Sequence, residues 1–69
     1  MMMGKVKSYD EAKGFGFIQP DDGGQEVFVN AIAVERAGLG DLIKGQEVSF
    51  DTFIDRRSGT TAVHDIETV

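Results

Sequence analysis

The sequence predicts an all-β fold in which a small five-stranded antiparallel sheet closes into a barrel. Nine glycines are spread along the 69 residues, so few windows are long enough for a stable helix. Several short segments alternate between apolar and polar residues with the period of two that is typical of strands. A flat sheet in so short a chain would expose two edges and one apolar face, which favours closure.

Turn residues and alternation divide the first half of the chain into three strands. We expect these strands at residues 5–9, 13–20 and 26–30, separated by turns at residues 10–14 and 20–24. Two short connections in succession predict an antiparallel meander. In the first strand Val6 points to one face, whereas Lys5, Lys7 and Tyr9 share the other. Ile18, Val27 and Val29 are available to the interior with Val6.

The second half adds two strands. Residues 32–37 can hold one helical turn. Residues 47–55 then predict a fourth strand, because their side chains alternate between two faces: Val48, Phe50, Thr52 and Ile54 on one side and Ser49, Asp51, Phe53 and Asp55 on the other. Residues 56–59 form a loop. Residues 60–68 are rich in β-branched side chains and predict a fifth strand, whose inward set the pattern leaves open.

Length and composition favour a binding surface over an enzyme. A mass of 7.5 kDa predicts one domain, residues 1–69, with too thin a core for an enclosed cleft, and so no small-molecule substrate. There is no cysteine, and the single histidine, His64, lacks a convincing catalytic partner. Asp21 and Asp22 supply too few oxygens for a calcium site and are interpreted as turn residues. We therefore expect no catalytic residue, no metal and no cofactor.

No apolar run exceeds four residues, so the sequence predicts neither a membrane span nor a signal peptide and favours a cytoplasmic protein. The net charge of −5 argues against a polyanionic partner. However, five of the seven cations fall in two short segments: Lys5, Lys7 and Lys13, and Arg56 and Arg57. Charge alone leaves open that these cations are ordinary solvated side chains.

The most informative segment is residues 13–18, which carry two phenylalanines on one strand face. Phe15 and Phe17 share that face, and Phe28 points away from Val27 and Val29. If the valines are internal, the three rings meet on the solvent side, with Tyr9 and Lys7 facing the same way. Exposed rings edged by lysines suit nucleic acid, because bases stack on rings while lysines contact phosphates.

The phenylalanines have two other interpretations. They could form the core with the valines outside, but three rings would overfill so small a barrel. They could also form a protein-binding patch.

Five segments carry a resemblance to a known family: residues 4–7 (GKVK), 13–18 (KGFGFI), 22–24 (DGG), 27–29 (VFV) and 45–50 (GQEVSF). Through them the chain resembles the bacterial cold shock protein family over essentially its whole length. Residues 13–18 and 27–30 are similar to the family's two ribonucleoprotein motifs. The resemblance implies an oligonucleotide-binding barrel that binds single-stranded RNA and DNA, often as an RNA chaperone or regulator of transcription or translation in stress adaptation.

The resemblance also implies which residues bind. Lys7, Lys13, Phe15, Phe17 and Phe28 match the family's binding positions, and Tyr9 replaces a phenylalanine. With the remaining cations and Asn30, which stands where the family has histidine, the predicted set is Lys5, Lys7, Tyr9, Lys13, Phe15, Phe17, Phe28, Asn30 and Arg56.

Several positions depart from the family pattern. Ser8 stands where the family usually has tryptophan, and Ala31 and Leu39 replace aromatic residues. Each lost ring removes a stacking partner, so the departures weaken binding or shorten the bound segment. The alternative function is a cold-shock fold that acts through a protein partner. We expect a monomer, with a dimer left open. The fifth strand carries one extra residue relative to the family, which predicts a bulge.

Overall fold

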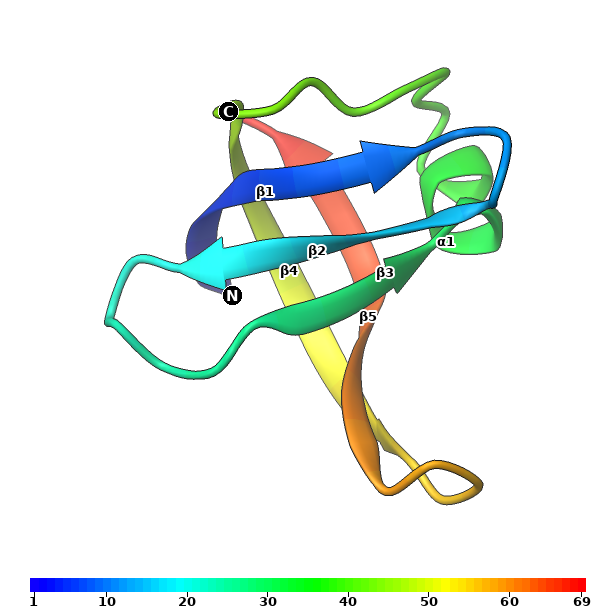
Figure 1. The fold of residues 1–69 in the computed structure, drawn as a ribbon. Helices are drawn as coiled ribbons and strands as arrows, with labels where there is room; N and C mark the ends of the chain where they lie inside the picture. The colour runs from blue at the N-terminus through cyan, green and yellow to red at the C-terminus, as the bar shows by residue number, and fades with distance from the viewer.

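The computed structural model describes residues 1–69, and its five strands close into a barrel (Figure 1). The elements in chain order are β1 (Met2–Asp10), β2 (Phe15–Pro20), β3 (Val27–Asn30), α1 (Ala31–Arg36), β4 (Glu47–Asp55) and β5 (Thr60–Thr68). Around the barrel the strand order is β1-β2-β3-β5-β4, and β4 pairs with β1. The predicted all-β five-stranded barrel and its initial meander are confirmed.

The sheet is antiparallel as predicted, except where β3 meets β5. These two strands pair in parallel through Phe28 and Ala62, whereas the other neighbouring pairs are antiparallel. The parallel pair follows from the odd number of strands in the barrel. Strand directions cannot alternate all the way around a ring with an odd number of members, so a closed five-stranded barrel needs at least one parallel contact.

The starts of the first three strands differ from the sequence prediction, and β3 begins one residue late, at Val27. β1 begins three residues early, because Met2 to Lys5 pair with β4 while Gly4 to Asp10 pair with β2. One strand thus serves two neighbours and closes the barrel. β2 begins two residues late, at Phe15, because Gly14 adopts a φ of +79° in the preceding turn and donates its N–H to the Asp10 carbonyl at 2.8 Å.

The core lies inside the barrel and is built from aliphatic side chains and one phenylalanine. Val27 and Val29 are buried, as are Ile18 and Val6. This overturns the alternative in which the valines face solvent. α1 covers one end of the barrel and buries Ala33 and Val34 against the same cluster (Figure 1). No helix has the length and apolar character needed to cross a bilayer.

Two bulges interrupt the pairing. In β1, Val6 pairs with Ile18 and Ser8 pairs with Phe17, so Lys7 is the extra residue. In β5, Asp65 pairs with Asp51 and Val63 pairs with Thr52, so His64 is the extra residue. The bulge predicted for the fifth strand is confirmed. Beyond it, the β4–β5 hairpin projects from the barrel (Figure 1), which leaves Ile54 69% exposed although Val48 and Phe50 of the same set are buried.

Gly16 provides a test of the β1–β2 packing. A Cβ at Gly16 would lie 2.2 Å from the Ser8 carbonyl oxygen and 2.7 Å from the Tyr9 Cα, and backbone atoms cannot yield locally. We expect Gly16→Ala to lower the free energy of unfolding by about 2 kcal/mol or more, measured by urea denaturation.

Gly40→Ala is the matched control, because a Cβ at Gly40 meets nothing within 4 Å. We expect this variant to change the free energy of unfolding by less than about 0.5 kcal/mol. Equal effects of the two substitutions would contradict the packing described here.

Candidate nucleic-acid interface

Three phenylalanine rings meet on the outer face of β2 and β3. Phe17 lies directly opposite Phe28, and Phe15 lies opposite Asn30. The ring centroids are 5.7 Å apart for Phe15 and Phe28, 5.9 Å for Phe17 and Phe28 and 6.1 Å for Phe15 and Phe17. Phe15 and Phe28 are stacked at 24°, and Phe17 meets both rings edge-on. The sequence prediction that these rings share an outer face is confirmed.

The alternation of the two strands fixes this arrangement. Ile18 and Val29 fill the interior, so the residues next to them in the chain must point outward. Phe17 and Phe28 are half-buried, and Phe15 is exposed at 36%. The three rings, which we call the aromatic face, are held by neighbouring strands and by one another, so the surface is formed before any ligand arrives.

The prediction that Tyr9 shares the face of Lys7 and the rings is wrong. The bulge at Lys7 reverses the alternation, so Ser8 pairs with Phe17 on the outer face and Tyr9 pairs with Gly16 on the inner one. Tyr9 packs against the core cluster. Partial burial raises the pKa of its hydroxyl, and the nearby carboxylates, first that of Asp41, add to the shift.

Two of the predicted lysines are engaged by carboxylates. The Nζ of Lys7 on β1 forms an ion pair with Glu26, which precedes β3, so the pair spans β2. The Nζ of Lys5 lies 3.1 Å from Glu47 and 3.3 Å from Asp21. Glu47 and then Asp21 raise the pKa of Lys5. Conversely, hydrogen bonding with Glu47 and then with Lys5 lowers the pKa of Asp21.

Lys13 and Arg56 differ from these two lysines because neither side chain forms an ion pair in the structure. Lys13 lies in the exposed turn two residues before Phe15. Arg56 lies in the exposed loop between β4 and β5, next to Arg57, which also forms no ion pair. The two predicted cations that form no ion pair therefore both lie in connections between strands.

Asn30 has a structural role that the sequence analysis did not assign. It is the N-cap of α1, and its Oδ1 accepts a hydrogen bond from the Ala33 backbone N–H at 3.1 Å. An N-cap side chain satisfies a backbone donor that has no partner within the helix. The amide oxygen of Asn30 is thus engaged, although the residue is exposed and lies opposite Phe15.

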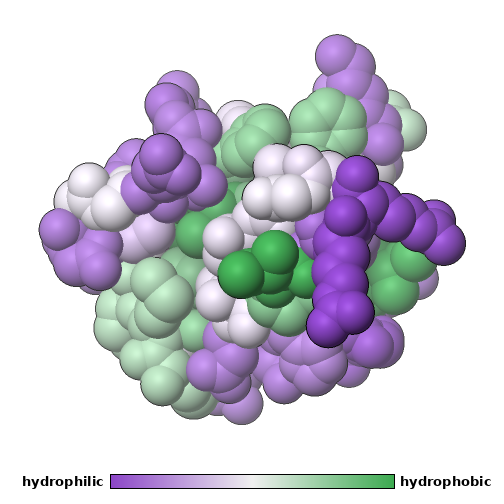
Figure 2. Space-filling model, turned by 90° about the horizontal axis from the view of Figure 1, so that it is seen from below, coloured by the Kyte–Doolittle hydropathy of each residue, from purple (hydrophilic) through white to green (hydrophobic).

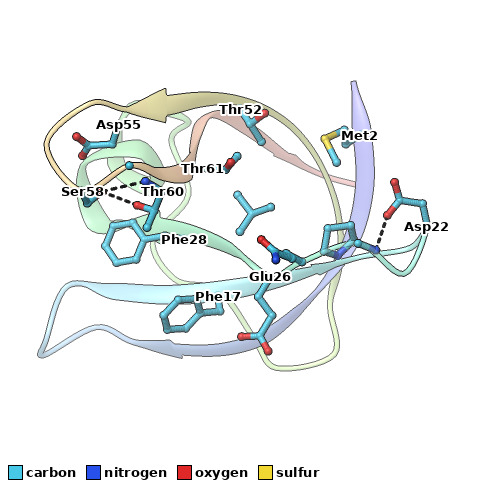
Figure 3. Close-up of a pocket in the computed structure, with 15 residues that line it drawn as sticks. Met2, Phe17, Asp22, Glu26, Phe28, Thr52, Asp55, Ser58, Thr60 and Thr61 are labelled. Atoms are coloured by element: carbon cyan, nitrogen blue, oxygen red, sulfur yellow. Dashed lines mark hydrogen bonds between the residues drawn. The ribbon is translucent and has the colours of Figure 1, made fainter.

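A groove of about 920 Å³ lies beside the aromatic face. It is bounded by Phe17, Phe28 and the loop before β3 on one side and by the β4–β5 hairpin on the other (Figure 3). Near Phe28, the hydroxyl oxygens of Ser58 and Thr60 lie 2.5 Å apart and are hydrogen-bonded to each other in the hairpin turn (Figure 3). Most lining residues are exposed. The projecting hairpin thus bounds an open groove. The sequence analysis excluded only an enclosed cleft and did not predict this groove.

The surface around the groove is mixed in polarity. Seen from below, apolar atoms occupy the middle of the molecule and hydrophilic groups stand around much of its rim (Figure 2). No three His, Cys, Asp or Glu side chains are grouped as a metal site requires. Such a surface suits a ligand with flat apolar parts and polar edges, which describes an unpaired nucleobase.

Comparison with known proteins identifies the family. The family of 'cold-shock' DNA-binding domains matches residues 2–66. The chain belongs to the cold-shock domain family. Cold shock protein CspA of Rhizobium meliloti is 50% identical over 66 residues, which are 96% of each chain. A probable cold shock protein of Sinorhizobium fredii is 49% identical over 97% of each chain. The cold shock-like protein CspC of Shigella flexneri is 46% identical over 88% of this chain and 87% of its own.

Some residues depart from the pattern of the cold-shock domain family, and the structure shows where they lie. Ser8 is exposed opposite Phe17, so a ring missing at this position shortens the aromatic face on the β1 side. Leu39 packs against the core cluster instead of extending that face. Ala31 is the first residue of α1, directly after Asn30.

Two features of this cold-shock domain surface were missed by the sequence analysis. The ion pair of Glu26 with Lys7 joins residues 19 positions apart, and only the meander brings them together. Phe53 is 46% exposed and its ring lies 6.2 Å from that of His64. The alternation of residues 47–55 places Phe53 on the opposite strand face from Val48 and Phe50. This pattern could have predicted that Phe53 is exposed.

The capping role of Asn30 can be tested. We expect Asn30→Ala to lower the free energy of unfolding by about 1 kcal/mol, because the Ala33 N–H loses its acceptor. Asn30→Ser is the matched control and should stay close to the wild-type value, because serine also caps helices well. Thermal and urea unfolding measure both. An Asn30→Ala variant as stable as Asn30→Ser would contradict the capping role.

Proposed function

We infer that residues 1–69 act as one module that binds single-stranded RNA and DNA by stacking unpaired bases on Phe15, Phe17 and Phe28. The observation that carries this inference is the aromatic face itself, three solvent-accessible rings whose centroids lie within 6.1 Å of one another on the outside of the sheet. Base stacking on such rings is worth about 1–3 kcal/mol per base and needs no particular sequence.

The family match and the relatives named cold shock proteins support nucleic-acid binding. The preference for single strands follows from the aromatic face, because a base within a duplex keeps its faces stacked on its neighbours. By trapping unpaired bases, the protein would melt RNA hairpins as an RNA chaperone in the cytoplasm during stress adaptation. It acts as a monomeric binding module rather than as an enzyme.

The phosphate contacts of this module come from Lys13 and Arg56, whose side chains form no ion pair, and from Lys5 and Lys7 once phosphate displaces their carboxylates. Displacing a carboxylate offsets part of the gain from a new phosphate contact. The proposed site therefore depends more on stacking than on charge, in keeping with the net charge of −5.

Loss of two of the three rings should weaken binding strongly. We expect wild-type protein to bind a fluorescent oligo-dT of about eight nucleotides with a micromolar or lower Kd, as measured by anisotropy. Phe15→Ala/Phe17→Ala removes two stacking rings and should weaken binding by at least about a hundredfold. Raising the salt concentration should weaken wild-type binding, because phosphate contacts release counterions.

The control for this experiment is the folded state of each variant, checked by circular dichroism and urea unfolding. If folded wild-type protein fails to bind at low salt, the proposed function is wrong. The same surface would then be tested as a protein-interaction module, which the missing family rings would favour.

Neutralising Glu26 should strengthen binding. In Glu26→Gln, Lys7 loses its carboxylate partner and becomes available to phosphate. We expect a Kd lower by a few fold and a plot of log K against log salt that is steeper by up to about 0.7, the value for one phosphate contact on a single strand.

Asp22→Asn is the matched control, because it removes the same charge from the same loop. Asp22 accepts a hydrogen bond from the Gly24 N–H, forms no ion pair with a lysine, and an asparagine oxygen can replace it. Equal tightening by both substitutions would show an effect of net charge alone and would contradict the specific role of the Lys7–Glu26 pair.

A further inference from the structure

An aromatic pair on β4 and β5 has no role in the site described so far. Phe53 is 46% exposed, and the His64 ring stands almost perpendicular to it, at 84° and a centroid distance of 6.2 Å. His64 is exposed as well. Large aromatic groups left open to water on a small domain commonly mark a contact surface.

The strand register makes this pair continuous with the aromatic face. Phe17 pairs with Phe28, Phe28 with Ala62, and Ala62 with Phe53. Paired residues point to the same side of a sheet, so this row crosses four strands on the outer face. Neighbouring strands are about 4.8 Å apart, so the backbone positions of Phe28 and Phe53 are separated by roughly 10 Å.

Only a small side chain separates the two sets of rings. Ala62 faces outward with its partners in the row, yet only 5% of it is exposed, since phenylalanines flank it on both neighbouring strands. No large side chain in the row separates Phe28 from Phe53. A strand of nucleic acid lying on Phe28 can therefore continue over Ala62 without an obstacle in that row.

The aromatic pair is also held in place. The bulge adds His64 as the unpaired residue of β5, between the pairing of Val63 with Thr52 and that of Asp65 with Asp51. Its Nδ1 lies 2.9 Å from Asp65 Oδ2, and its carbonyl accepts a hydrogen bond from Arg36 Nη2 at 3.1 Å. Contacts on the ring and on the backbone restrict the motion of this residue, which lowers the entropy cost of stacking a ligand on it.

We propose that Phe53 and His64 form a second stacking platform, which takes a further unpaired base of the single strand bound to Phe15, Phe17 and Phe28. The inference rests on the proposed function and extends its site across β5 onto β4. Asp51 and Asp65 are paired on the same outer face and repel phosphate. The platform therefore contributes through base stacking, with Arg36 as the nearby cation.

The test compares a short and a long oligonucleotide, because only the long one reaches the second platform. We expect Phe53→Ala to weaken binding of an oligo-dT of about eight nucleotides by about tenfold and to leave one of about four nucleotides unchanged. The slope of log K against log salt should not change, since no phosphate contact is lost.

Ile54→Ala is the matched control, because Ile54 is 69% exposed on the same strand and points to the opposite face. It should bind both oligonucleotides as wild type does. A second readout needs no substitution. The chain has a single histidine, so the ring protons of His64 are readily assigned by NMR, and they should shift with the long oligonucleotide but not with the short one.

The outcomes separate this inference from the proposed function. If Phe15→Ala/Phe17→Ala loses binding while Phe53→Ala matches Ile54→Ala at both lengths, or His64 does not respond to the long oligonucleotide, the second platform is wrong and the proposed function stands. If wild-type protein binds neither oligonucleotide, the proposed function fails and the platform with it.

Discussion

The antiparallel register of β2 and β3, in which Phe17 lies opposite Phe28, is the constraint on which both the core and the candidate binding face depend. With this register, Ile18 and Val27 meet inside the barrel and the phenylalanines meet outside. A slip of one residue would exchange the two faces, exposing aliphatic side chains and forcing rings into a core that has no room for them. Stability of the fold therefore enforces the geometry of the candidate binding face.

Electrostatics gives this surface a different character from that of a basic nucleic-acid-binding protein. The chain carries a net charge of −5, and both Lys5 and Lys7 are paired with carboxylates. These exposed ion pairs add little to stability. In the proposed mode of binding they compete with phosphate for the lysines, so affinity comes largely from base stacking, to which the second aromatic pair at Phe53 and His64 adds.

The two β-bulges show why alternation alone does not predict the direction of every side chain. Alternation predicted Tyr9 on the face of Lys7, but one extra residue in β1 turned Tyr9 inward and brought Ser8 beside Phe17. The bulge in β5 was predicted from the length of the segment relative to the family, yet its consequence, His64 beside Phe53, was not. A bulge is set by the pairing between strands, which no single strand records.

The sequence by itself determined the all-β class, the five strands, the inward valines and the three outward phenylalanines. These properties follow from local signals, namely turn residues and a period of two within each strand. Only the tertiary structure decided the parallel contact of β3 with β5, the ion pair of Lys7 with Glu26, the capping role of Asn30 and the row from Phe17 to Phe53. Each of these depends on which distant residues become neighbours when the barrel closes, and that is a property of the closed sheet rather than of any segment.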